Sequence, residues 1–239
     1  MRWPKPMSDG VLVLRYKRFL ADVRRPDGEV ITVHCPNSGR MLTCSEPGRP
    51  VWISDSQNDK RKLRYTLEAI RMGRTWVGVN TANPNRAVED FVRRGRIDEL
   101  TGYAELRREV PYGEGNRSRI DLLLEHPDRP RCWVEVKNNT YRTDGPAGDG
   151  YAAFPDAVTE RGRKHLLELE DRVKAGERAV LFYFIGRNDC YRVRPADEID
   201  PRYGEVLRQV AASGVEILAY RMRLDRRGIH LAGRLPVEL

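Results

Sequence analysis

The chain has 239 residues, of which 33% are charged, with a net charge of +8 and a pI near 9.5. This length allows one large domain or two small ones, each with its own core. No apolar stretch is long enough to cross a membrane, and the first residues lack the apolar centre of a signal peptide. The four cysteines are widely separated and match no zinc-binding spacing, so we expect a cytoplasmic protein with reduced thiols and no membrane contact.

Positive charge is concentrated in the N-terminal third. Residues 1–80 contain 15 Lys and Arg against 8 Asp and Glu, whereas the remaining residues contain 28 against 27. An evenly spread excess would indicate solubility alone. An excess in one segment, with aromatic residues between the cations, favours a surface that binds a polyanion.

The first 82 residues predict a small all-β domain. Helical periodicity is scarce, and turn signals such as Pro26-Asp27-Gly28 separate short strand-like runs. These runs cover residues 11–16, 19–24, 30–34 and 51–54. The pattern is typical of an OB-like β-barrel, whose open face commonly binds nucleic acid.

Two clusters in this domain combine cations with aromatic rings. They are Arg15-Tyr16-Lys17-Arg18, followed by Phe19, and Lys60-Arg61-Lys62-Leu63-Arg64, followed by Tyr65. Such cations bind phosphates without sequence choice, and such rings can stack on bases. We expect Arg15, Lys17, Arg18, Lys60, Arg61, Lys62 and Arg64 to contact DNA, with RNA as an alternative. Tyr16 and Phe19 could equally be core residues.

Residues 83–239 predict an α/β domain. The order of elements is a helix, three strands, a helix and a strand, followed by a further helix and strand. The corresponding residues are 86–100, 103–110, 120–124, 132–137, 162–174, 179–185, 201–213 and 215–220. This is the order of restriction-endonuclease-like folds, in which paired acids lie on the second and third strands.

Two acids and a lysine lie on those two strands. A Pro-containing turn separates Asp121 from Glu135 and Lys137, so a hairpin would bring Asp121 beside Glu135. Alternation along a strand puts Glu135 and Lys137 on one face. Paired carboxylates need a cation, and oxygen ligands select hard ions, so we predict that Asp121 and Glu135 bind Mg²⁺ or Mn²⁺ and that Lys137 activates water. The spacing is that of a PD-(D/E)xK nuclease site, with an ordinary polar hairpin face as the alternative.

The first helix offers a third carboxylate. Val88, Phe91 and Val92 would occupy its buried side, which leaves room for one acid near the edge of that face. Glu89 is our candidate for this additional metal ligand, and Asp90 is the alternative.

The helix that follows the Glu-x-Lys strand carries further polar residues. We expect Asp156 to cap this helix, on which Arg161 and His165 lie one turn apart. Arg161 could bind the scissile phosphate, and His165 could contact it or transfer a proton. The alternative is that both belong to a solvated face with Glu160 and Glu168.

Four stretches resemble signatures of the sugar fermentation stimulation protein A family. They are residues 16–22, 34–41, 154–166 and 214–220. The resemblance covers nearly the whole chain and implies an OB-like domain, a nuclease-like domain and non-specific DNA binding. A regulatory role in maltose metabolism has been attributed to this family. The Gly- and Asp-rich segment 143–150 departs from the family pattern, and we interpret it as a surface insertion or a flap over the site.

These observations support three functional hypotheses. The first is a metal-dependent nuclease that the basic barrel holds on its substrate. The second is a regulatory DNA-binding protein that keeps the nuclease scaffold without cutting. The third is an RNA-processing nuclease. Two carboxylates placed near phosphates favour retained catalysis, because a protein that only binds DNA has no need of them.

Overall fold

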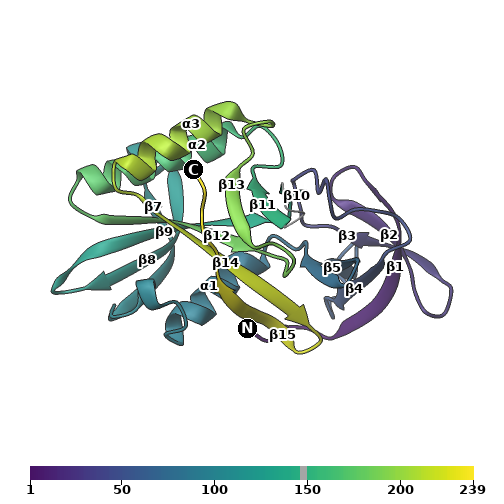
Figure 1. Cartoon of the computed structure of the whole chain (residues 1–239). Helices are drawn as coiled ribbons and strands as arrows, with labels where there is room; N and C mark the ends of the chain where they lie inside the picture. The colour runs from purple at the N-terminus through teal and green to yellow at the C-terminus, as the bar shows by residue number, and fades with distance from the viewer. Residues whose placement is uncertain (146–149) are drawn as a thin grey trace.

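Six strands of the N-terminal part curl into a small barrel (Figure 1). The computed structural model describes residues 1–145 and 150–239. The strands are β1 (Met7–Tyr16), β2 (Leu20–Arg24), β3 (Val30–His34), β4 (Pro50–Asp55), β5 (Tyr65–Met72) and β6 (Thr75–Gly78). They pair antiparallel in the order β3-β2-β1-β4-β5-β6, and His34 also pairs with Thr66, which brings β3 to β5. Inward-facing apolar side chains fill the interior, as predicted for an OB-like domain.

A mixed six-stranded sheet forms the centre of the C-terminal part. Its strands are β7 (Glu105–Tyr112), β8 (Ser118–His126), β9 (Arg129–Asn139), β12 (Arg178–Ile185), β14 (Glu216–Asp225) and β15 (Gly228–Arg234). The order is β15-β14-β12-β9-β8-β7, with β12 parallel to both of its neighbours and the outer pairs antiparallel. The central strand β12 is buried along nearly its whole length, which explains its continuous apolar run.

Helices cover both faces of this sheet, which confirms the predicted α/β class (Figure 1). α1 (Asn83–Arg93) packs on one face, and α2 (Glu160–Lys174) and α3 (Pro201–Ala212) pack on the other. Two short 3₁₀ helices, η1 (Asp98–Leu100) and η2 (Glu114–Asn116), complete the helical elements of the described residues. Among residues 1–145 and 150–239, no helix combines the length and the apolar character needed to span a bilayer.

The predicted helix at residues 86–100 is displaced toward the N-terminus. It starts at Asn83 because Pro84 fits the first turn, where its missing N–H is not needed. It ends at Arg93 because Gly95 adopts a left-handed φ of 60°, which breaks the helix. Ile97 and Leu100 nevertheless reach the core through η1, so their apolar character is explained by burial outside α1.

A third, three-stranded sheet lies between the two larger ones. It consists of β10 (Arg142–Asp144), β11 (Gly150–Phe154) and β13 (Arg192–Pro195), with β11 in the middle. The predicted insertion at 143–150 therefore contributes its two ends to paired strands, since Thr143 pairs with Tyr151 and Asp144 with Gly150. Residues 146–149 of that segment lie outside the described residues.

The barrel and the C-terminal part share a hydrophobic core. Trp52 on β4 stacks on Trp76 with ring centroids 3.8 Å apart, and both belong to the cluster that contains α1 and one face of the main sheet. Although residues 1–82 were expected to form the barrel, the first three residues lie on the C-terminal part. The amino group of Met1 donates to the carbonyl of Ile229 at 2.8 Å, and Trp3 Nε1 donates to the carbonyl of Asp225 at 2.8 Å. Figure 1 shows the N-terminus beside β15.

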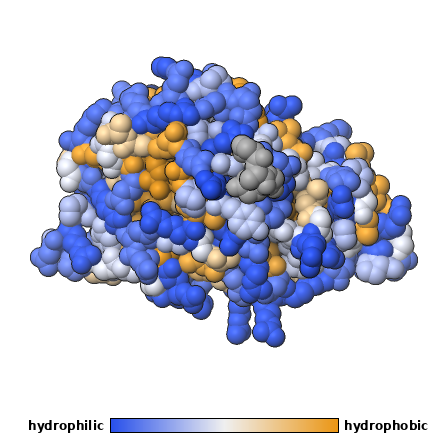
Figure 2. Space-filling view, in the orientation of Figure 1, coloured by the Kyte–Doolittle hydropathy of each residue, from blue (hydrophilic) through white to orange (hydrophobic). Residues whose placement is uncertain are grey.

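Hydrophilic residues cover most of the face shown in Figure 2, with hydrophobic areas among them. The large apolar side chains exposed on the barrel strands and their β1–β2 turn are Val11, Leu14, Phe19 and Val30. Phe19 is therefore not a core residue. Tyr16 is partly buried, and its hydroxyl donates to Asp22 Oδ1 at 3.1 Å.

Candidate active site

The β8–β9 hairpin brings Asp121 to Glu135, as its spacing predicts. Leu122 pairs with Val134, and continuation of that register places Asp121 opposite Glu135. Asp121 Oδ2 accepts a hydrogen bond from the backbone N–H of Val136 at 2.6 Å. Its other oxygen, Oδ1, accepts from Asn85 Nδ2 on α1, also at 2.6 Å. The carboxylate is thus held from both the neighbouring strand and the helix.

Glu135 presents one satisfied and one unsatisfied oxygen. Lys137 Nζ donates to Oε1 at 2.6 Å, and His165 Nδ1 lies 2.5 Å from the same oxygen. The residue is only 3% exposed, and Oε2 is buried without a hydrogen-bond partner among the described residues. A buried carboxylate oxygen without a partner is costly, so this atom is poised to accept a ligand.

The two carboxylates have opposite pKa shifts. Burial raises the pKa of Asp121 to about 7, and the negative charge of Glu135 acts in the same direction, against the Val136 N–H and the Lys137 charge. Burial also raises the pKa of Glu135, but Lys137 and His165 together outweigh burial and hold that pKa below its ordinary value. Of the two acids, Glu135 is therefore the one that keeps its negative charge to lower pH.

A cavity of about 750 Å³, here called the acidic cavity, opens around these acids. Its walls include residues 84–85, 116–119 and 135–138, together with Glu109, Asp121, Arg161, Lys164 and His165. Arg117, Arg119, Arg161 and Lys164 place positive charge around the paired carboxylates. The cavity therefore combines an acidic centre with a basic surround, which suits a polyanion bound over a metal ion.

The α2 residues that line this cavity are linked to Glu135. Arg161 Nε donates to His165 Nε2 at 3.3 Å, while the other ring nitrogen of His165 faces Glu135. Lys164 Nζ instead contacts Ser118 Oγ at 3.2 Å and Glu168 at 3.4 Å. The structure thus brings Arg161 and His165 to the site rather than to a solvated face with Glu168.

The helix begins later than expected. Asp156 does not cap α2; the cap is Thr159, whose hydroxyl accepts from the N–H of Gly162 at 3.0 Å. Asp156 Oδ2 accepts instead from the backbone N–H of Met41 in the barrel at 3.1 Å. This acid is therefore a link between the two parts of the chain.

Glu89, the candidate third metal ligand, does not line the acidic cavity. Its carboxylate pairs with Arg93 at 3.0 Å and with Arg108 at 3.2 Å. Asn85, about one turn earlier on α1, occupies the place expected for Glu89. Helical periodicity identifies the face of a helix but not how far its N-terminus reaches over the sheet, so this displacement was not visible in the sequence.

Glu109 is an acidic residue that sequence reasoning missed. Arg108 pairs with Leu122 and Val110 with Ile120, so Glu109 lies in register with Asp121 across β7 and β8. Its φ of 51° is unusual for a residue with a side chain, and such conformations concentrate at functional sites. Glu109, Asp121 and Glu135 therefore lie opposite one another on the adjacent strands β7, β8 and β9. A signal for Glu109 exists only in the pairing of β7 with β8, which follows from the fold and not from local spacing.

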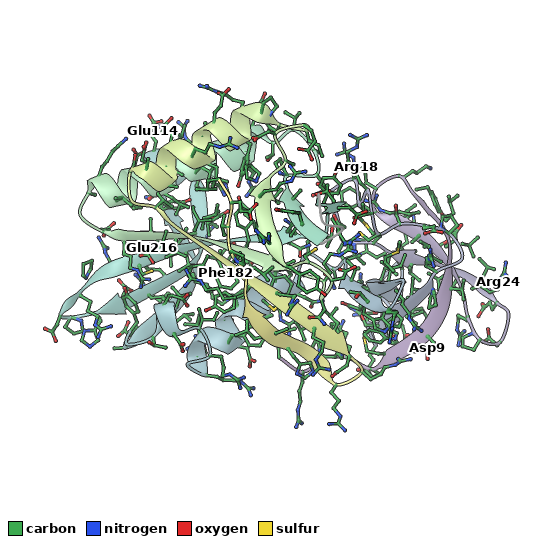
Figure 3. All side chains as sticks on the ribbon, in the orientation of Figure 1. Asp9, Arg18, Arg24, Glu114, Phe182 and Glu216 are labelled. Carbon is green, nitrogen blue, oxygen red and sulfur yellow. The ribbon has the colours of Figure 1, made fainter. Side chains whose placement is uncertain are left out.

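The basic clusters of the barrel have different surroundings. The Arg15 guanidinium donates to the carbonyls of Asn37 and Gly39, both at 2.9 Å, so this residue holds a loop. Arg18 lines a cavity at the domain junction, and Figure 3 shows it nearer to the C-terminal part than Arg24. Lys17 precedes it in the same turn.

The second cluster lies away from both cavities. Arg64 pairs with Asp55 at 2.8 Å, and Arg61 Nη1 approaches Thr66 Oγ1 at 3.4 Å. Neither these residues nor Lys60 and Lys62 line the acidic cavity or the cavity at the domain junction. Their proposed contact with nucleic acid would therefore be remote from the acids.

The junction cavity, here called the seam cavity, has a volume of about 420 Å³. It is lined by residues 37–39, 137–141 and 153–159, with Arg18 and Thr81. It shares Ser38, Thr81, Lys137 and Asn138 with the acidic cavity, so the two adjoin. The two longest sequence signatures, 34–41 and 154–166, therefore meet in space although more than a hundred residues separate them.

Comparisons with known proteins agree with this architecture. The N-terminal OB domain of sugar fermentation stimulation proteins matches residues 13–79, and the RE domain of the same proteins matches residues 82–228. Sugar fermentation stimulation protein homologs of Geobacter metallireducens and Maricaulis maris are 53% and 51% identical over 239 residues and cover 100% of this chain and 100% and 99% of their own. The structure of Pyrococcus furiosus SfsA in complex with Ca²⁺ has a TM-score of 0.87 and 26% identity, with 100% of both chains covered.

Proposed function

This chain belongs to the sugar fermentation stimulation protein family, and we propose that it is a divalent-metal-dependent nuclease that binds and cuts DNA. The observation that carries this proposal is the unpartnered, buried Oε2 of Glu135 beside Asp121. A protein that only bound DNA would gain nothing from two acids among the cations of its binding surface, because each acid repels phosphate. A site that also binds a cation resolves that conflict.

Asp121 and Glu135 are the residues that would hold the metal ion. Among residues 1–145 and 150–239, no three His, Cys, Asp or Glu side chains are grouped to hold an ion, so backbone, water or phosphate oxygens would complete the coordination. Mg²⁺ usually retains several waters and uses only one or two protein carboxylates, which fits this set. When bound, such an ion orients a water and offsets charge that develops at a phosphate. The structure of the Pyrococcus furiosus relative is a complex with Ca²⁺, which supports binding of a divalent ion by this chain.

Lys137 and the cavity arginines would act on the phosphate directly. Lys137 Nζ lies 2.6 Å from Glu135 Oε1, so its charge is held at the acidic centre. In this PD-(D/E)xK arrangement Lys137 would hold the attacking water and offset charge on the phosphate. Arg161 lines the same cavity and would contact a neighbouring phosphate oxygen, while Arg117 and Arg119 would hold the rest of the strand.

His165 acts as a positioning residue in this proposal. The 2.5 Å approach of Nδ1 to Glu135 requires a proton on Nδ1, and the donation from Arg161 requires an acceptor at Nε2. Both conditions define one neutral tautomer. Both ring nitrogens are therefore engaged in orienting Glu135 and Arg161, which disfavours the alternative role of a proton shuttle.

The test is cleavage of end-labelled single-stranded and double-stranded DNA, and of RNA of the same sequence, with Mg²⁺, Mn²⁺ or EDTA. We expect metal-dependent cutting of DNA that falls at least a hundredfold in Glu135→Gln and in Lys137→Ala. Glu125→Gln is the matched control, because Glu125 lies on the same hairpin and pairs with Arg107 outside the acidic cavity.

A second readout separates metal binding from catalysis. Ca²⁺ should raise the melting temperature of the wild type and of Glu125→Gln but not that of Glu135→Gln. Cutting that persists in Glu135→Gln would contradict the site, and cutting of RNA alone would reassign the substrate. Binding of DNA without cutting under every metal would leave a DNA-binding module and refute the nuclease.

A further inference from the structure

The seam cavity contains a buried polar group that the reaction at the acids does not use. Asn139, at the end of β9, is 1% exposed and lines this cavity, yet neither Oδ1 nor Nδ2 has a hydrogen-bond partner among the described residues. The neighbouring Asn138 Oδ1 is also buried and unpartnered. Each such group costs stability unless something supplies the missing bond, and the Asn139 amide, which lacks a partner for both its donor and its acceptor, indicates a ligand with both donors and acceptors.

Three hydrogen bonds fix the walls of the seam cavity on the barrel side. Arg15 holds the backbone of the 37–39 loop, and the N–H of Met41 binds Asp156 across the seam. A Cβ at Gly39 would lie 2.6 Å from Asp156 Oδ2, so only glycine permits this close approach. The cavity is therefore a built feature of the junction and not a gap left by loose packing.

The chemistry of the remaining lining points to a flat aromatic ligand that carries a phosphate. Ala153, Phe154 and Val158 form an apolar side, and Val158 is 67% exposed although it is apolar. Two cations, Arg18 and Lys137, line the cavity, one from the barrel and one shared with the acidic site. A nucleobase has apolar faces, a polar edge and an attached phosphate, so it matches each of these three surfaces.

The position of Asn139 relates this cavity to the acids. Glu135, Lys137 and Asn139 alternate along β9 and therefore point to the same face of the strand. Two residues along a strand span about 6.6 Å, so Asn139 lies about one step beyond Lys137. A strand whose phosphate rests at the acids would bring an adjoining nucleotide to the seam cavity.

We propose that the seam cavity receives an unstacked base of the nucleotide next to the phosphate at the acidic site, with the Asn139 amide paired to the edge of that base. This inference rests on the proposed function for the location of the phosphate. A side-chain amide offers a donor group, NH2, beside an acceptor oxygen, which suits a base edge that carries both. Because a base must leave its stack to enter, single-stranded or unpaired nucleotides are favoured over a regular duplex.

The experiment measures the affinity of the full chain for fluorescent single-stranded DNA oligonucleotides in EDTA, with an abasic site moved through every position. In the wild type, loss of the base at one position should lower the affinity roughly tenfold. Loss of the base at any other position should change the affinity little. Asn139→Leu should bind all abasic and intact strands alike, because it cannot pair with a base edge.

Thermal unfolding provides the control for folding. Because the Asn139 amide is unpartnered in the free protein, Asn139→Leu should keep or raise the melting temperature, whereas a structural amide would lower it on substitution. Asn58→Leu is the matched control, since Asn58 is exposed on a barrel loop outside both cavities and should keep the abasic dependence.

The outcomes separate this inference from the proposed function. A wild type that binds every abasic strand equally, or an Asn139→Leu variant that keeps the position dependence, overturns the base-binding cavity. The nuclease proposal would stand in either case if cutting still required Glu135. A wild type that binds no DNA, either in EDTA or with Ca²⁺ present, would overturn both proposals.

Discussion

Asp121 and Glu135 show how their surroundings differentiate two neighbouring carboxylates. The charge of Lys137 and the contact with His165 offset the burial of Glu135, whereas Asp121 faces Glu135 with fewer compensating contacts. Sequence spacing predicted the pair because a hairpin is a local structure. Glu109 and Asn85 were not predicted, since their places depend on the pairing of β7 and on the docking of α1.

Asp121→Asn should stabilise the metal-free protein above neutral pH. The pKa of Asp121 is about 7 in the folded chain and ordinarily 3.8, so the unfolded chain loses this proton first as pH rises. The free energy of unfolding of the wild type therefore falls between pH 4 and 7 and stays lower above that range. We expect the variant to gain about 1–3 kcal/mol at pH 8 and little near pH 4.

Urea unfolding in EDTA at several pH values measures this difference. Asp128→Asn is the control, because Asp128 lies exposed in the turn of the same hairpin and should show no comparable gain. A variant that is no more stable than the wild type at pH 8 would show that ionised Asp121 is not strained in the fold.

At the scale of secondary-structure elements, the residue at which α2 starts determines the positions of Arg161 and His165. Thr159 caps this helix, and Asp200 binds both the N–H of Thr159 at 2.9 Å and that of Tyr203 at the start of α3. Sequence patterns located both helices and the central strands, because burial imposes their periodicity. They missed β5, whose first residues follow a basic cluster. They also placed the α2 cap at Asp156, because the contact of Asp156 with the barrel cannot be seen in a local pattern.

Asp200→Ala should destabilise the chain much more than Thr159→Ala. Asp200 is 2% exposed and also pairs with Arg163 at 2.9 Å, so its loss leaves a cation and two helix starts without their acceptor. We expect a cost of about 3 kcal/mol or more for Asp200→Ala and about 1 kcal/mol for Thr159→Ala.

Denaturant unfolding compares these variants with Asp197→Ala. Asp197 pairs with Arg208, but both side chains are well exposed, so its substitution should change stability by less than about 1 kcal/mol. If Asp200→Ala and Asp197→Ala lowered the free energy of unfolding equally, Asp200 would not be the residue that links the starts of α2 and α3.

At the scale of the whole molecule, the two predicted domains pack against each other through a shared hydrophobic core. Trp52 and Ala69 of the barrel share a core with α1 and the main sheet, and the N-terminal residues return to β14 and β15. The sequence predicted both folds, because each has its own alternation of apolar residues. It did not predict their joint core, since contacts between distant segments leave no periodic signal.

The chain should therefore unfold in a single calorimetric transition that covers both parts. Trp3→Ala should lower the midpoint of that transition without splitting it, at a cost of about 1–3 kcal/mol, because Trp3 packs at the edge of Trp52 and bonds to Asp225. Arg24→Ala, at the exposed end of β2 in Figure 3, should leave the midpoint nearly unchanged. Two separate transitions in the wild type would show that the halves fold independently.

The contact of Gly39 and Met41 with Asp156 limits how the barrel and the C-terminal part can be exchanged between related proteins. The barrel and the C-terminal part are not interchangeable modules, because Gly39 and Met41 of the barrel fit closely against Asp156 of the C-terminal part. A chimera that combines this barrel with the C-terminal part of a distant relative keeps this fit only if the loop at 37–41 and the segment at 154–159 come from the same parent. We therefore expect substitutions at Gly39 and Asp156 to occur together, because a side chain at position 39 would meet the Asp156 carboxylate, although the two residues lie in separate parts of the chain.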